Sequence, residues 1–86
     1  MPEICRFLGI LISMNYNDHA PPHFHARYGS YKVMVDARTL RVIDGSLPPR
    51  VLGLVVEWAA AHTEELMADW ELARQEAPLN RIAPLT

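Results

Sequence analysis

Residues 23–36, HFHARYGSYKVMVD, carry the clearest structural pattern in this chain of 86 residues. Side chains of two kinds alternate on both sides of Gly29-Ser30, and this period of two is typical of half-buried strands. A Gly-Ser pair between two such runs predicts a tight hairpin turn. The stretch therefore predicts two antiparallel strands, and alternation places three polar side chains on one face of the first strand: His23, His25 and Arg27.

The flanking segments extend this hairpin into a meander. Residues 4–16 are mostly β-branched, aromatic or long apolar residues, and they predict a strand that Pro21-Pro22 separates from the hairpin. On the other side, a turn at Arg38-Thr39 leads to a brief strand over residues 40–43, which Asp44-Gly45 closes. We therefore expect a three- or four-stranded antiparallel sheet.

A helix is predicted to follow the sheet. Ser46 is a suitable N-cap, and Pro48-Pro49 falls in the first turn, where a missing N–H costs nothing. No helix breaker appears before Pro78, which predicts one long helix to about Gln75, with a kink near Thr63 as the alternative. Apolar or aromatic residues recur along it at steps of three and four: Val51, Val55, Trp58, His62, Leu66, Trp70 and Ala73.

Together these elements predict a single α+β domain over residues 1–77, with the helix packed on one face of the sheet, and an extended tail over residues 78–86. Leu52, Val56 and Met67 lie off the apolar stripe of the helix. A domain this small has no second layer to bury them, so we expect this face to contact a symmetric copy or a companion protein.

Composition excludes several classes of protein. Half of the residues are apolar and 21% are charged, which is typical of a globular domain. Cys5 is the single cysteine and cannot form an intramolecular disulfide, which favours a reducing compartment. Arg6 interrupts the first apolar run well before the ~20 residues of a membrane span, and no signal-peptide cleavage site follows. We therefore expect a cytoplasmic protein, and its net charge of −2 argues against a general nucleic-acid coat.

The stretch NDHAPPHFHAR, residues 17–27, concentrates three of the four histidines. His23 and His25 are two residues apart on a strand, so their side chains project about 6.5–7 Å apart and can share one metal ion. His19, with Asp18 or Asp36, would complete a site for a transition metal such as zinc or nickel.

Two other roles remain open for the same stretch. His23 and His25 could act as general acid and base on a phosphodiester, with Arg27 stabilising the developing charge and Tyr28 or Tyr31 stacking on an RNA base. Alternatively, the histidines order the loop by hydrogen bonds to its backbone and have no chemical role.

Several segments carry a family resemblance. They are MPEICRF at the N-terminus, the box PPHFHA at residues 21–26, and the helix segments SLPPR, EWA and WELA at residues 46–50, 57–59 and 70–73. Over about residues 1–77 the chain resembles a widespread family of small bacterial proteins known as domain of unknown function 4160. Members are commonly encoded beside a second small protein, an arrangement similar to toxin–antitoxin pairs.

Our first interpretation is therefore one component of such a two-protein module. We expect the apolar helix to bind the companion and the histidine face to be an effector surface acting on RNA. The resemblance itself assigns no catalytic residue. The positions that match the polar box of the family are Asn17, Asp18, His19, His23 and His25.

Overall fold

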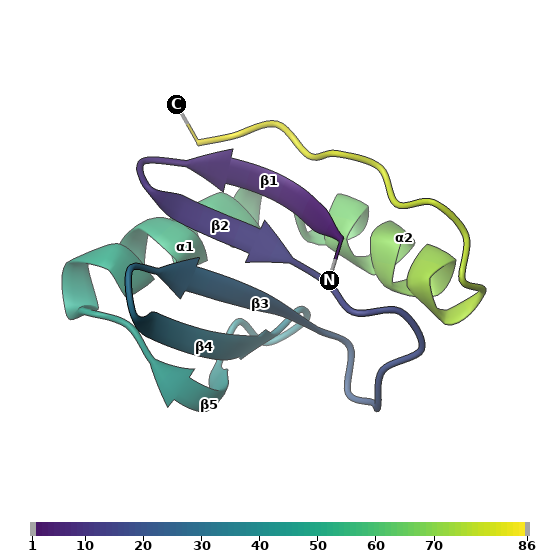
Figure 1. Cartoon of the computed structure of the whole chain (residues 1–86), viewed down its shortest axis with the longest axis horizontal. Coiled ribbons are helices and arrows are strands. Elements are labelled where there is room, and N and C mark those ends of the chain that lie inside the picture. Colours follow the sequence, from purple (N-terminus) through teal and green to yellow (C-terminus); the bar gives the residue numbers. More distant parts are fainter. Residues whose placement is uncertain (1, 86) are drawn as a thin grey trace.

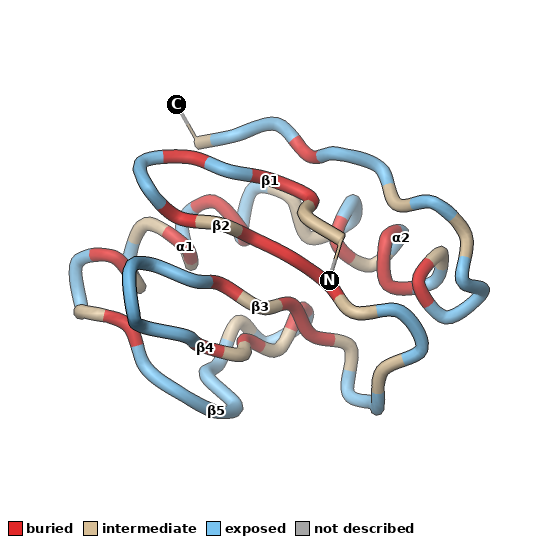
Figure 2. Tube along the Cα trace, viewed as in Figure 1, coloured by how far each residue is buried: buried red, intermediate tan, exposed pale blue. Residues whose placement is uncertain are grey.

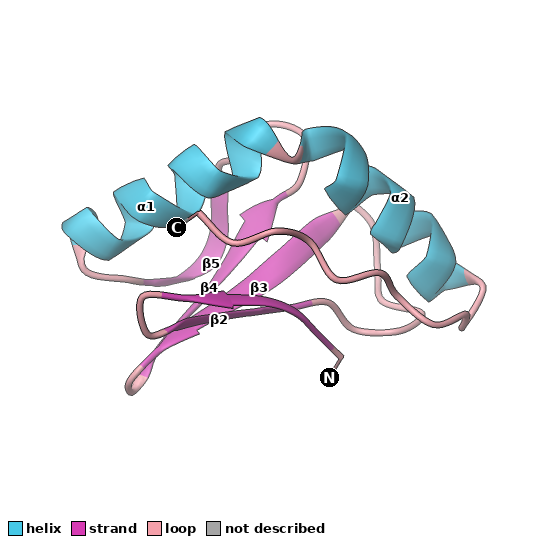
Figure 3. Cartoon of the chain, turned by 90° about the horizontal axis from the view of Figure 1, so that it is seen from above, coloured by secondary structure: helices cyan, strands magenta, loops and turns pink. Residues whose placement is uncertain are grey.

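The structure, a computed structural model that describes residues 2–85, has two layers, with a sheet on one side and two helices on the other (Figures 1 and 3). The helices are α1 (Pro49–Ala61) and α2 (Thr63–Arg74). The α+β class is confirmed, but the sheet is larger than predicted and the long helix is divided. The sheet is antiparallel, with its strands in chain order: β1 (Glu3–Phe7), β2 (Ile10–Ser13), β3 (His23–Tyr28), β4 (Tyr31–Asp36) and β5 (Val42–Ser46).

The first strand of the sequence prediction is in fact a hairpin. Leu8 and Gly9 adopt positive φ angles of 49° and 80° and connect Phe7 to Ile10, which pair across β1 and β2. A two-residue hairpin turn needs such angles, but leucine adopts them rarely. The apolar run over residues 4–16 therefore contained no strong turn signal, and the count of three or four strands was wrong.

The region after β4 also differs from the prediction. The last strand covers Val42–Ser46 rather than residues 40–43, so Gly45 lies within β5 and does not close it. Ser46 ends this strand and does not cap the helix. The N-cap of α1 is Pro48, which makes no side-chain capping bond.

The single long helix is replaced by two helices that meet at His62, whose φ of −131° and ψ of 28° are not helical. An unbroken helix from Pro49 to Arg74 would be about 39 Å long. The molecule measures 33 Å along its longest axis, so a straight helix would overrun the sheet. Figure 3 shows the bend between α1 and α2, which keeps both helices over the sheet. The apolar residues of the predicted helical stripe are buried: Val51, Val55, Trp58, Leu66, Trp70 and Ala73.

The C-terminal segment returns along the outer edge of β1 (Figure 1). The Ile82 backbone N–H donates to the Ile4 carbonyl at 2.8 Å, and the Trp58 indole N–H donates to the Ala83 carbonyl at 2.8 Å. Ile82 is buried, whereas β5 at the opposite edge of the sheet is exposed along its whole length (Figure 2). One edge of the sheet is thus covered by the chain itself.

Within residues 2–85, neither helix has the length and apolarity that crossing a membrane requires.

Candidate metal centre

Strand pairing defines the two faces of β3. Phe24 packs edge-on against Trp58 of α1 with ring centroids 6.0 Å apart, and it is fully buried between the layers. His23 and His25 alternate with Phe24 and project from the other face, as the sequence predicts. In the register of the sheet, His25 lies opposite Ser13 on β2.

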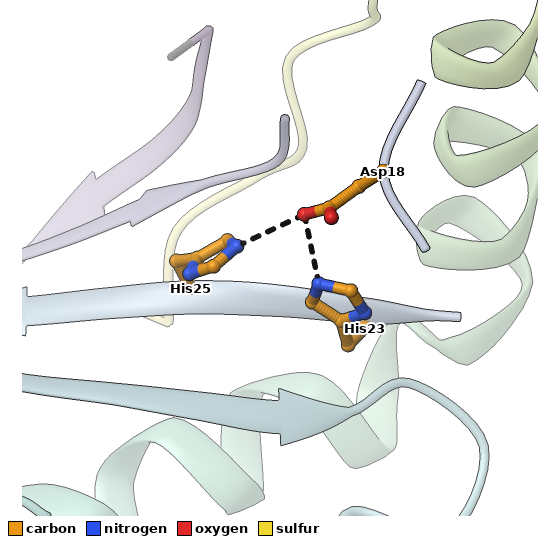
Figure 4. Close-up of side chains that lie close together, drawn as sticks. All are labelled: Asp18, His23 and His25. Carbon is orange, nitrogen blue, oxygen red and sulfur yellow. Dashed lines mark hydrogen bonds and ion pairs between the residues drawn. The ribbon is translucent and has the colours of Figure 1, made fainter. Parts of the chain in front are cut away.

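Three side chains meet at the start of β3 (Figure 4). Asp18, in the loop after β2, places its Oδ2 3.0 Å from His23 Nε2 and 3.6 Å from His25 Nε2. The side chains are largely shielded, with exposed fractions of 5% for His23, 19% for His25 and 21% for Asp18. Across the described part of the chain, these are the only three His, Cys, Asp or Glu side chains whose ligand atoms all lie within 4.8 Å of one another.

Hydrogen bonding determines which nitrogen of His23 carries a proton. Its Nδ1 lies 2.7 Å from the Pro21 carbonyl oxygen, and a carbonyl can only accept, so Nδ1 must be the donor. The Nε2 atom that faces Asp18 therefore carries a second proton or exposes a lone pair. With the second proton, Nε2 donates to Asp18; without it, the lone pair of Nε2 is free to bind a metal ion beside the carboxylate. A backbone carbonyl on the far ring nitrogen is also the usual support of a metal-bound histidine.

The same bond ties His23 to the backbone of the loop, which is the contact that the structural alternative drawn from the sequence expects. The ring also packs at 5.1 Å from the Trp70 ring of α2. Ordering the loop and binding an ion are compatible, because the two roles use different ring nitrogens.

In the metal-free cluster, where His23 Nε2–H donates to Asp18, the pKa shifts keep His25 neutral and Asp18 ionised. Burial lowers the pKa of His25, and the neighbouring His23 acts in the same direction. Burial alone would raise the pKa of Asp18, but hydrogen bonds from the His19 backbone N–H and from His23 outweigh it and lower that pKa. Neutral imidazole and ionised carboxylate are the forms that bind metals.

Three other candidates from the sequence lie elsewhere. His19 is exposed and reaches the cluster only through its backbone N–H, which donates to Asp18 Oδ1 at 2.8 Å. Asp36 Oδ1 accepts from the backbone N–H groups of Arg38 and Thr39. Arg27 is exposed farther along β3. The structure thus brings together Asp18, His23 and His25 from the predicted metal set, without His19 or Asp36.

Arg27 contributes instead to a shallow hollow of about 450 Å³ beside the cluster. His25 also lines this hollow, so the two features adjoin. Polar and charged side chains from β3, β4 and β5 complete it, among them Lys32, Asp44 and Ser46.

Asn15 belongs to the cluster, although the sequence did not single it out. Its Nδ2 lies 3.3 Å from Asp18 Oδ2 and 3.4 Å from His25 Nε2. Two buried oxygens next to the site, Asn15 Oδ1 and Ser13 Oγ, have no hydrogen-bond partner among the described residues. Alternation along β2 and the residues after it places Ser13 and Asn15 on the same face of the sheet as His25. This parity is the sequence signal that could have identified Asn15 as a member of the cluster.

The separations within the cluster fit a shared metal ion. In a tetrahedral site with metal–ligand distances of 2.0–2.2 Å, neighbouring ligand atoms are about 3.3–3.6 Å apart. The observed 3.0 Å and 3.6 Å are close to that range. Two imidazole nitrogens and one carboxylate oxygen suit zinc or nickel, and they are also the donor set of 2-His-1-carboxylate iron(II) sites.

Comparison with known proteins places the chain in a family. Residues 9–71 match the sequence profile described as a domain of unknown function, DUF4160. Neither the curated proteins nor the solved structures contain a match. Since the matched segment covers most of the chain, from the β1–β2 turn into α2, this protein belongs to the DUF4160 family.

Proposed function

We propose that this protein binds a divalent transition metal ion through Asp18 Oδ2, His23 Nε2 and His25 Nε2. The observation that carries the proposal is the convergence of these three atoms, with His23 held in its ligating orientation by the Pro21 carbonyl. The cluster joins the loop after β2 to the start of β3. A bound ion would therefore stabilise the native loop as well as occupy the site.

Titration calorimetry on chelator-treated protein without a histidine tag tests the proposal. We expect one ion per chain for at least one of Zn²⁺, Ni²⁺ and Fe²⁺, with Fe²⁺ titrated anaerobically. At a free concentration 100 times the Kd, the ion should stabilise the fold by about 2.7 kcal/mol, which a thermal melt detects.

Substitutions of the proposed ligands, compared with a substitution of the nearby His19, locate the site. His25→Ala and Asp18→Asn should lose most of the affinity, whereas His19→Ala should retain it because His19 lies outside the cluster. Failure of the wild type to bind any of the three ions at micromolar concentration would refute the proposal. Equal losses in His19→Ala and His25→Ala would refute this choice of ligands.

The second candidate function is an effector surface that acts on RNA within a two-protein module. Arg27 and Lys32 lie opposite each other on β3 and β4, and both line the hollow that adjoins His25. Two cations beside a histidine cluster suit a phosphodiester backbone, although Asp44 in the same hollow partly offsets them.

Binding of a short fluorescent single-stranded RNA at low salt tests this candidate. Arg27→Gln and Lys32→Gln should each weaken binding and reduce its salt dependence, since each removes about one phosphate contact. Arg50→Gln changes the same charge on α1, outside the residues of the hollow, and should have little effect. If the wild type does not bind RNA at low salt, this function is excluded.

For the partner surface, we propose that Leu52, Val56 and Met67 contact a second copy or the companion protein. All three are partly exposed, and Leu52 and Met67 also pack against the core, so the free apolar area is modest. Sedimentation should show an oligomer that Val56→Glu dissociates. Dissociation by Val42→Glu instead would move the contact to the exposed edge strand β5.

A further inference from the structure

The amide group of Asn15 lies where a fourth ligand would be expected. Its Nδ2 position is 3.3 Å from Asp18 Oδ2 and 3.4 Å from His25 Nε2. Both distances match the spacing of about 3.3–3.6 Å between ligands of one tetrahedral ion. The Asn15 amide therefore approaches the same point as the two residues that the metal proposal already contains.

In the orientation observed, the amide acts as a hydrogen-bond donor to the cluster. Its NH₂ group faces the Asp18 carboxylate and the Nε2 atom of His25, both of which can accept. The opposite atom, Oδ1, is buried and lacks a partner among the described residues. Such atoms are rare in native proteins, because an unpaired buried oxygen costs about 1–3 kcal/mol.

A metal ion would reverse the preference of this amide. Once the lone pair of His25 Nε2 binds an ion, that atom no longer accepts from the NH₂ group, and the positive ion repels the NH₂ hydrogens from the side that faces Asp18. Rotation of the amide by 180° about its terminal bond exchanges two groups of nearly equal size. The rotation would place Oδ1 in the present Nδ2 position, with its lone pairs toward the ion.

We propose that Asn15 Oδ1 is the fourth ligand and that the amide rotates when the ion binds. This inference rests on the proposed metal binding. It makes the site a closed one, with two nitrogens and two oxygens from the protein and no position left for substrate. Closed four-ligand sites are structural, whereas catalytic sites keep a position open. The ion would then hold residues 15–18 against β3.

Two substitutions at Asn15 separate a ligand from a simple hydrogen-bond donor. Asn15→Leu has a similar volume and removes the oxygen, so Zn²⁺ affinity should fall about tenfold or more. Asn15→Asp keeps an oxygen at the same position and adds a charge, so it should bind Zn²⁺ at least as tightly as the wild type. If Asn15 only donates a hydrogen bond to Asp18, both variants lose the donor and both should bind more weakly.

Asn17→Asp is the matched control, because it adds the same charge in the same loop at an exposed residue outside the cluster. Its Zn²⁺ affinity should stay within about twofold of the wild type, and a gain equal to that of Asn15→Asp would overturn the inference. Melting temperatures of the metal-free variants check that each one folds.

NMR provides a readout that does not depend on affinity. In ¹⁵N-labelled protein, Zn²⁺ should shift the side-chain NH₂ signals of Asn15 strongly and leave those of Asn80 unchanged. If the wild type binds Zn²⁺ and Asn15→Leu binds equally well, the Asn15 inference fails while the metal proposal stands. If the wild type binds none of the ions, both fail.

Discussion

Asp18 uses its two carboxylate oxygens for different purposes. Oδ1 accepts the His19 backbone N–H at 2.8 Å and shapes the loop, while Oδ2 faces both imidazoles. Asp18→Asn can keep the first contact and remove the charge from the second. Loss of metal binding in that variant, with the metal-free melting temperature little changed, would therefore report the ligand role and not loop folding.

Gly45 shows how one residue constrains the sheet. It lies within β5 at a φ of +77°, a region that other residues rarely adopt. A Cβ at this position would collide with the carbonyl oxygen of Lys32 on β4. The close approach of the two strands at this point therefore depends on glycine.

We predict that Gly45→Ala destabilises the fold by about 2 kcal/mol or more, through both backbone strain and the collision with Lys32. Gly53→Ala is the control. Gly53 is an exposed residue of α1 with open space around a new Cβ, so alanine should stabilise the fold by about 0.5–1 kcal/mol. Urea unfolding measures both changes. Equal effects of the two substitutions would contradict the role assigned to Gly45.

At the scale of elements, α2 carries a buried carboxylate that faces the C-terminal segment. Asp69 Oδ1 accepts the Asn80 backbone N–H at 2.9 Å, and Oδ2 is buried without a partner in the described chain. Burial raises the pKa of Asp69 above its ordinary 3.8, and the nearby charge of Glu65 adds to this effect. The contact that ties α2 to residue 80 is therefore sensitive to protonation.

Because folding raises the pKa of Asp69, this group favours the native state at low pH, and the contribution is lost as pH rises through the raised value. Asp69→Asn keeps the acceptor for Asn80 without the charge. It should be more stable than the wild type at pH 7, by about 1–3 kcal/mol. The difference should shrink toward pH 4.

Urea unfolding between pH 4 and pH 8 measures this difference. Asp44→Asn, at an exposed residue of β5, is the control and should show no such trend. A deficit for Asp69→Asn that grows as pH rises would show instead that the charge itself stabilises the contact.

At the scale of the molecule, the C-terminal segment completes the core. Ile82 is buried, and its backbone N–H pairs with Ile4 at the outer edge of β1. Arg81 forms an ion pair with Glu3 at 3.0 Å. The segment closes over β1 as an additional extended strand would and leaves β5 as the exposed edge.

We predict that Ile82→Ala lowers the free energy of unfolding by about 2 kcal/mol or more, the usual cost of truncating a buried isoleucine. Pro84→Ala, at an exposed residue of the same segment, should cost less than about 0.5 kcal/mol. Denaturant unfolding compares the two variants. If Ile82→Ala is as stable as Pro84→Ala, the segment contributes nothing to the core.

Local periodicity explains which parts of the fold could be predicted. Alternation around Gly29-Ser30 identified the β3–β4 hairpin and the shared face of His23 and His25, because side-chain direction in a strand depends only on parity. The helical stripe identified Trp58 and Trp70 as buried for the same reason. The Leu8-Gly9 turn was missed because leucine rarely adopts a positive φ, so Leu8 is not a residue that predicts a hairpin turn.

The sequence by itself determined the class of fold, the strand that carries the histidines, and the residues of the helices that face the sheet. These depend on neighbours within a few positions along the chain. Only the tertiary structure decided that Asp18 and Asn15 join His23 and His25 while His19 stays outside, and that Ile82 returns to β1. Such contacts depend on how a loop closes and on where a bent helix ends. Both are determined by the packing of segments that are distant in the sequence, and a local pattern does not contain that information.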